Sequence, residues 1–139
     1  MNKISRTLLS IAAVSALSIG FAFAQVGSLN VSIPFAFTAG KAVLPAGDYT
    51  IEPRFGSPVV FIRNLQNRET IAILAQPNYG SYKDTGSKVV FRVHGDKHYL
   101  ASTWIGSTGT GRQFMETSDE RKVEMASGQT NYTTLLARR

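Results

Sequence analysis

The chain has 139 residues, no cysteine and a formal net charge of +6 at neutral pH. This length suits a single domain, and the lack of cysteine excludes disulfide bonds and the lipid-modified cysteine of a lipoprotein. The charged residues are scattered along the chain, which argues against nucleic-acid binding.

Residues 1–24 have the three parts of a secretory signal peptide: a short basic start, an apolar run from Leu8 to Phe21, and the small-x-small sequence Ala22-Phe23-Ala24. The apolar run is shorter than the roughly 20 residues of a membrane-spanning helix. We therefore expect cleavage after Ala24, a periplasmic or secreted domain over residues 25–139, and no membrane span after cleavage. This domain carries 13 basic and 9 acidic residues, a charge of +4.

The first half of the domain predicts strands. Apolar residues alternate from Leu29 to Phe37, which is typical of a half-buried strand, and Pro34 within it predicts an edge position or a bulge. The sequence Leu-Pro-Ala-Gly at 44–47 predicts a type I turn before a strand over 48–52. The run Val59–Ile62 is apolar at every position, which predicts a central strand that is covered on both faces or lies inside a small barrel.

A further strand over 70–75 is expected to pair with this central strand, and a long loop should follow between 77 and 86. The clearest hairpin joins Lys88–His94 to Lys97–Ile105 through Gly95 and Asp96. Its simplest register pairs Phe91 with Leu100 and Val89 with Ser102. That register puts Trp104 on the core side, and Arg92 and His94 on the opposite face.

The C-terminal part predicts a flexible connection over 106–111, then a short helix from Ser118 to about Ala126 that ends at Gly128. A last strand over 130–137 should close the sheet. The predicted fold is all-β with one short C-terminal α-helix: a single small antiparallel β-barrel or sandwich of about seven strands.

Two groups of polar residues could carry chemistry. His94, Asp96 and His98 are close enough in sequence for a metal site, but the hairpin register separates the histidines onto opposite faces, so we expect no metal, one solvated histidine and one buried. Glu116, Glu120 and Glu124 recur every four residues and are interpreted as a solvated helix face.

Aromatic and arginine side chains are enriched in binding surfaces, so the candidate ligand-binding residues are Tyr79, Tyr82, Trp104 and Arg112. Core packing is the alternative for Trp104. The chain has no Gly-x-Ser-x-Gly elbow and no cysteine nucleophile, and we expect neither catalytic residues nor a cofactor.

Two stretches, VSIPFAFTAGKAVLPAGDYTIE at 31–52 and VVFRVHGDKHYLASTW at 89–104, resemble a family of small exported β-rich proteins of acidobacterial type. Members pair a PFxFxxGxxxLPAGxY opening with a later VFxxxGDxYxLxxxW hairpin; this chain has Lys97 and His98 before Tyr99, where the usual spacing is shorter. The resemblance implies export and a β-rich fold, and it implies no activity and no site residues.

Three functions remain open. The leading hypothesis is an exported, non-enzymatic β-domain that binds an envelope component or a protein partner. The first alternative is a carrier of a small apolar ligand inside a β-barrel, which a roomy interior would favour and a filled core would oppose. The second is a hydrolase, which a cleft with His94 or His98 beside an acid would favour.

Overall fold

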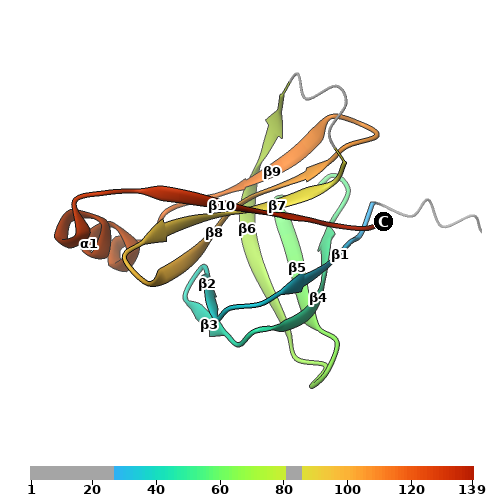
Figure 1. Ribbon diagram of the computed structural model, residues 1–139. Coiled ribbons are helices and arrows are strands. Elements are labelled where there is room, and N and C mark those ends of the chain that lie inside the picture. The colour runs from blue at the N-terminus through green and yellow to red at the C-terminus, as the bar shows by residue number, and fades with distance from the viewer. Residues whose placement is uncertain (1–26, 81–85) are drawn as a thin grey trace, which may run out of the picture.

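The computed structural model describes residues 27–80 and 86–139, so the expected signal segment and Tyr82 lie outside the described residues. Ten strands and one helix occupy these two ranges (Figure 1). The elements are β1 (Leu29–Ile33), β2 (Phe37–Ala39), β3 (Ala42–Leu44), β4 (Gly47–Pro53), β5 (Val59–Asn64), β6 (Thr70–Tyr79), β7 (Lys88–His94), β8 (Lys97–Ile105), β9 (Thr110–Phe114), α1 (Ser118–Ser127) and β10 (Asn131–Leu136). The prediction of a mostly β fold with one short C-terminal helix is confirmed.

The strands form one sheet in the order β1-β4-β5-β6-β9-β8-β2-β3, and β7 pairs with both β8 and β10. All strand pairs are antiparallel except β2 and β8, which meet in parallel where Thr38 faces Tyr99. One edge of β8 pairs with β7. Its other edge pairs with both β9 and β2. Among the described residues, no continuous ladder closes the sheet: β1 is joined to the chain just after β10 at an isolated pair, where Asn30 and Arg138 exchange backbone hydrogen bonds of 2.7 and 2.8 Å.

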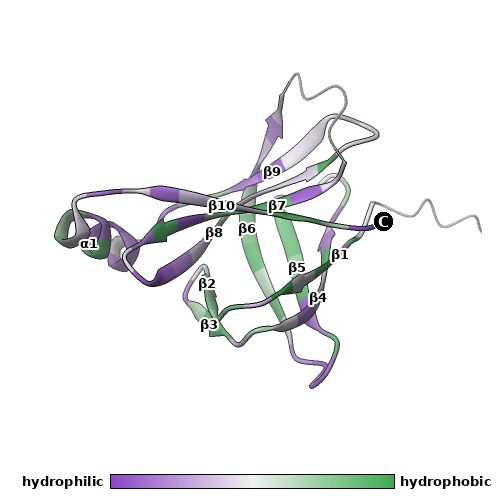
Figure 2. Cartoon of the chain, viewed as in Figure 1, coloured by the Kyte–Doolittle hydropathy of each residue, from purple (hydrophilic) through white to green (hydrophobic). Residues whose placement is uncertain are grey.

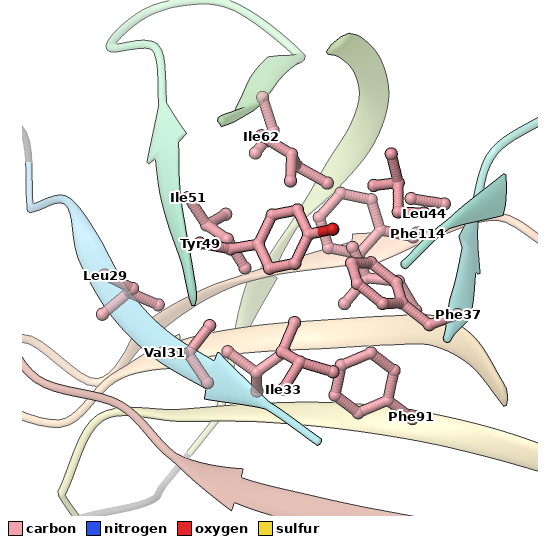
Figure 3. Close-up of a cluster of buried hydrophobic side chains, with 14 of the residues drawn as sticks. Leu29, Val31, Ile33, Phe37, Leu44, Tyr49, Ile51, Ile62, Phe91 and Phe114 are labelled. Atoms are coloured by element: carbon pink, nitrogen blue, oxygen red, sulfur yellow. The ribbon is translucent and has the colours of Figure 1, made fainter. Parts of the chain in front are cut away.

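The inner face of the curved sheet carries the hydrophobic core, which aromatic and aliphatic side chains fill (Figure 3). Green, hydrophobic segments run along β5 and β6 in Figure 2, whereas α1 is mixed. The alternation predicted for the first strand is confirmed for β1, in which Leu29, Val31 and Ile33 are buried and the residues between them are exposed. Burial of this cluster is the main source of stability.

The predicted strand Leu29–Phe37 is in fact two strands, because β1 ends at Ile33 and β2 begins at Phe37. Pro34 lies in the gap, and a residue without an N–H group cannot continue a ladder. After β2 the chain turns at Gly40, whose φ of +62° favours glycine, and returns as β3, which sequence reasoning missed. The prediction of about seven strands was therefore too low for the described residues.

The second missed strand is β9, which lies between β6 and β8 and pairs with both. It occupies part of the chain expected to be a flexible connection over 106–111. To meet β9, β6 continues beyond the predicted end at Ala75 to Tyr79. The expected long loop after residue 77 therefore begins later, and its residues 81–85 lie outside the described ranges.

The prediction that β5 is covered on both faces is wrong for Phe61, which lies on the outer face and is only half-buried. The Arg54 guanidinium lies 5.9 Å from the centre of the Phe61 ring, within range of a cation–π contact. The opposite face of β5 is covered as expected, because Val60 and Ile62 belong to the core.

The hairpin of β7 and β8 begins and ends where the sequence predicts, and Gly95 in its turn has a φ of +64°. Phe91 pairs with Leu100 as expected, but a β-bulge between Val90 and Phe91 shifts the rest of the register. Val89 therefore faces Thr103, so the predicted pairing with Ser102 and the predicted position of Trp104 on the core side are both wrong.

The segment Leu-Pro-Ala-Gly-Asp-Tyr at 44–49, which carries part of the resemblance noted above, is fixed by side-chain contacts. The buried Tyr49 hydroxyl donates a 2.6 Å hydrogen bond to the Pro45 carbonyl and accepts one of 3.0 Å from the Asn64 side chain. Burial raises the pKa of Tyr49, so its hydroxyl keeps the proton that it donates. A Cβ at Gly47 would lie 2.8 Å from the Gln66 amide oxygen and would displace that oxygen from the Asp48 N–H, which donates to it. This segment therefore holds β3, β4 and β5 together.

Candidate functional site

A pocket of about 560 Å³ opens at the end of the sheet where the described chain begins and ends. Gly27 and Arg139 both line it, and the C-terminus lies on the opposite side of the molecule from α1 in Figure 1. We call this hollow the end pocket. Apolar residues such as Leu29, Pro53 and Ile105 form most of its wall.

Cross-strand rows on β6, β9 and β8 build one wall of the end pocket. Pro77, Arg112 and Thr103 stand side by side in one row, and Tyr79, Thr110 and Ile105 form the next. Side chains two residues apart on a strand share a face, so both rows face the pocket. The wall exists only because β9 is inserted between β6 and β8.

Two large aromatic side chains at the rim of the end pocket are exposed to solvent, Phe55 by 87% and Tyr79 by 80%. Phe55 follows the end of β4, and Tyr79 is the last residue of β6. Neither belongs to the hydrophobic core cluster, so core packing does not explain them. Exposed aromatic groups beside an apolar hollow are typical of a binding site.

Among the described residues that line the end pocket, the charged ones are Arg112 and Arg139. Arg112 donates a 3.4 Å hydrogen bond from Nη2 to the backbone carbonyl of Arg54, and Arg139 donates one of 2.7 Å from Nη1 to the Ser107 hydroxyl. No aspartate or glutamate is among the described residues that line the pocket. The electrostatic potential there is consequently expected to be positive.

Of the four predicted ligand-binding residues, the structure brings Tyr79 and Arg112 together in the end pocket. Trp104 is buried, lies opposite Lys88 and packs behind β9, where a Cβ on Gly111 would come within 2.8 Å of its ring. Tyr82 lies outside the described residues. Sequence reasoning missed Phe55 and Arg139, which have no local pattern that connects them to the other lining residues.

A second polar cluster lies on the outer face of β7, under α1. Arg92 donates to both carboxylate oxygens of Glu120, at 2.6 Å from Nε and 3.1 Å from Nη2, and also to the carbonyls of Phe114 and Leu100. Both side chains are almost fully buried. The interpretation of Glu120 as part of a solvated helix face is therefore wrong, because its side chain points toward the sheet and pairs with Arg92.

His94 belongs to the same cluster and is 1% exposed, so the expectation of a solvated histidine at this position is wrong. Its ring lies 3.3 Å from Glu120 through Nε2 and 3.4 Å from the Thr130 hydroxyl through Nδ1. Although this order resembles a hydroxyl–histidine–carboxylate triad, the Thr130 hydroxyl donates to Glu124 at 2.8 Å. A substrate could not reach a ring without exposed surface.

The pKa of the neighbouring Tyr99 is raised by its surroundings in this cluster. Burial raises the pKa of Tyr99, and the negative charge of Glu120 raises it further. The two rings of Tyr99 and His94 lie 5.5 Å apart. The contacts of Glu120 with Arg92 and His94 connect α1 to β7, so this polar cluster fixes α1 on the sheet.

The three residues considered for a metal site are held apart. The His98 ring stacks on Phe35 with 3.9 Å between ring centres, whereas the His94 ring contacts Glu120 under α1. In residues 27–80 and 86–139, no group of three or more acidic or histidine side chains could hold a metal ion.

Comparisons with models of protein families, with curated proteins and with solved structures found no match to this chain. Within the described ranges, no helix combines the length and the apolar character needed to cross a membrane.

Proposed function

We propose that this chain is an exported, non-enzymatic β-domain that binds a small, largely apolar ligand in the end pocket. The observation that carries the proposal is the end pocket itself, with Phe55 and Tyr79 exposed at its rim. Its volume of about 560 Å³ lies within the range of about 300–1,000 Å³ that is usual for small-molecule sites. An envelope component is a suitable source of such a ligand for an exported protein.

The proposal includes the finer prediction that the strands curl into a small barrel. The exchange of backbone hydrogen bonds between Asn30 and Arg138 supports it, since that pair joins β1 to the segment that follows β10. The middle of such a barrel would be occupied, because the core side chains fill the inner face (Figure 3). A ligand would therefore sit at one end of the barrel, and a central carrier cavity is disfavoured.

A hydrolase is the weaker alternative. His94 does lie beside an acid, Glu120, but the two side chains are 0% and 2% exposed and Arg92 occupies both carboxylate oxygens. The end pocket, by contrast, is open to a ligand but has no histidine or carboxylate among its described lining residues. The pocket that a substrate could enter thus has no catalytic groups among its described residues, and the buried His94 and Glu120 are closed to a substrate.

The site is tested with N-phenyl-1-naphthylamine, a neutral apolar fluorophore whose emission rises in apolar surroundings. We expect saturable binding of one molecule to the purified protein. Tyr79→Ala and Phe55→Ala should each weaken binding about five- to ten-fold, because each removes an aromatic contact of roughly 1 kcal/mol. Fluorescence titration measures these affinities.

Tyr132→Ala is the matched control, since Tyr132 is 66% exposed on β10 and does not line the end pocket. It should leave the affinity unchanged, and all three variants should unfold at the same temperature as the unchanged protein. Absence of saturable binding, or an equal loss with Tyr132→Ala, would contradict the proposal.

Export, on which the choice of ligand source depends, is tested separately. When the full chain is expressed in a Gram-negative host, we expect the protein in the periplasm or medium to begin at Gln25. N-terminal sequencing and intact mass measure this. A protein that stays in the cytoplasm with residues 1–24 attached would show that the segment is not a signal peptide.

A further inference from the structure

The charge of the end pocket restricts the ligands that it can bind. Arg112 and Arg139 both line it, and no aspartate or glutamate side chain in residues 27–80 and 86–139 forms a salt bridge with either guanidinium. The contrast with Arg92 is clear, because that guanidinium is neutralised by Glu120 at 2.6 Å. The two pocket arginines keep their charge available for another anion.

The local geometry leaves N–H donors of Arg112 available at the pocket rim. Arg112 stands in the cross-strand row between Pro77 and Thr103, so its side chain rises directly from the pocket wall. One of its N–H groups donates to the Arg54 carbonyl at 3.4 Å, which holds the guanidinium near the rim and leaves other donors of its fork available. The hydroxyls of Thr108 and Thr110 also lie at the pocket, but they hydrogen-bond each other at 2.6 Å.

An apolar wall with a cationic rim is complementary to a molecule that has an apolar body and an anionic head. We propose that the ligand of the end pocket is an anionic amphiphile, with one apolar chain in the pocket and a carboxylate, such as that of a fatty acid, between Arg112 and Arg139. The inference rests on the proposed function, whose site it shares. Arginine suits this role because its planar fork matches a carboxylate.

Three probes with the same chain and different heads test the inference: dodecanoate, dodecanol and dodecyltrimethylammonium. Calorimetric titration of the purified protein is run at pH 8, where the carboxylic acid is ionised, and below the concentrations at which the probes form micelles. We expect dodecanoate to bind about ten-fold more tightly than dodecanol, and the cation to bind least. The advantage of dodecanoate should shrink as salt is added.

Two variants test whether the preference for dodecanoate over dodecanol arises in the end pocket. Arg112→Gln and Arg139→Gln should each weaken dodecanoate binding about three- to ten-fold and leave dodecanol binding unchanged. Arg138→Gln is the matched control, because it removes the same charge from the adjacent exposed residue, which does not line the pocket. It should have little effect on either probe.

The outcomes separate the two proposals. Equal binding of all three probes, or tighter binding of the cation, would overturn the anionic ligand and leave the apolar site standing. An equal loss with Arg138→Gln would also overturn it, since the preference would then come from overall charge. Binding of none of the probes would overturn the proposed function itself.

Discussion

Glu120→Gln is expected to lower the free energy of unfolding by about 3 to 5 kcal/mol, the usual cost of removing one partner from a buried ion pair. Glu120 is 2% exposed and accepts two hydrogen bonds from Arg92. An amide at this position has the same size but no negative charge, so the buried Arg92 guanidinium would keep only the partly exposed Glu116 carboxylate, 3.8 Å from Nε, as a counter-ion. Urea denaturation followed by circular dichroism measures the change.

Two controls identify the cause. Glu116→Gln should cost less than about 1 kcal/mol, because that side chain is 37% exposed and lies 3.8 Å from Arg92. Replacing Arg92 and Glu120 together by methionine should restore most of the stability, since no unpaired charge would remain. If Glu120→Gln unfolds at the same urea concentration as the unchanged protein, the ion pair is not what fixes α1.

The ion pair matters because α1 has little apolar surface with which to dock. Glu120 is its one buried residue among those described, and Met125 is 77% exposed. The helix otherwise depends on its ends, where Thr117 accepts a hydrogen bond from the Glu120 amide and Gly128 adopts a φ of +67°. The sequence predicted the helix from Ser118 as its cap and from Gly128 at its end, whereas the cap is Thr117, one residue earlier. Nothing local indicated that a glutamate in the first turn would be buried.

The parts of the fold that the sequence predicts well are those with local signals. β7 and β8 were placed correctly because a Gly-Asp turn joins two runs of alternating residues, and β1 because its apolar residues alternate. The bulge between Val90 and Phe91, where Ala101 of β8 has no partner on β7, was not predictable in this way, because neither strand carries a local signal for it. Because the register shifts by one residue, Trp104 lies on the face of the sheet opposite to that of Val89.

The parts that the sequence misses depend on contacts between distant segments. β9, with the sequence Thr-Gly-Arg-Gln-Phe, has no apolar alternation, and it is a strand because β6 and β8 offer hydrogen bonds on both of its edges. The end pocket depends on this insertion. Tyr79 and Arg112 could be named as candidates from their residue types, but only the pairing of β6 with β9 places them at one site.

The second large effect is expected for Phe37→Ala, which should lower the free energy of unfolding by about 3 to 5 kcal/mol. Phe37 is 2% exposed, and its ring meets those of Tyr49 and Phe91 edge-on, with ring centres 5.2 and 5.4 Å apart (Figure 3). Truncation would remove both aromatic contacts and leave a cavity that the surrounding strands can only partly fill. Thermal and urea denaturation measure the loss.

Phe55→Ala makes the same chemical change at a position that is 87% exposed, and it should leave the free energy of unfolding nearly unchanged. The two variants should therefore separate stability from binding: the first lowers stability through the core, and the second weakens an apolar ligand at the rim of the end pocket. If Phe37→Ala costs no more than Phe55→Ala, the hairpin of β2 and β3 does not unfold together with the rest of the sheet. A stability loss with Phe55→Ala would instead mean that its ring supports the fold, and its exposure would then no longer point to a ligand.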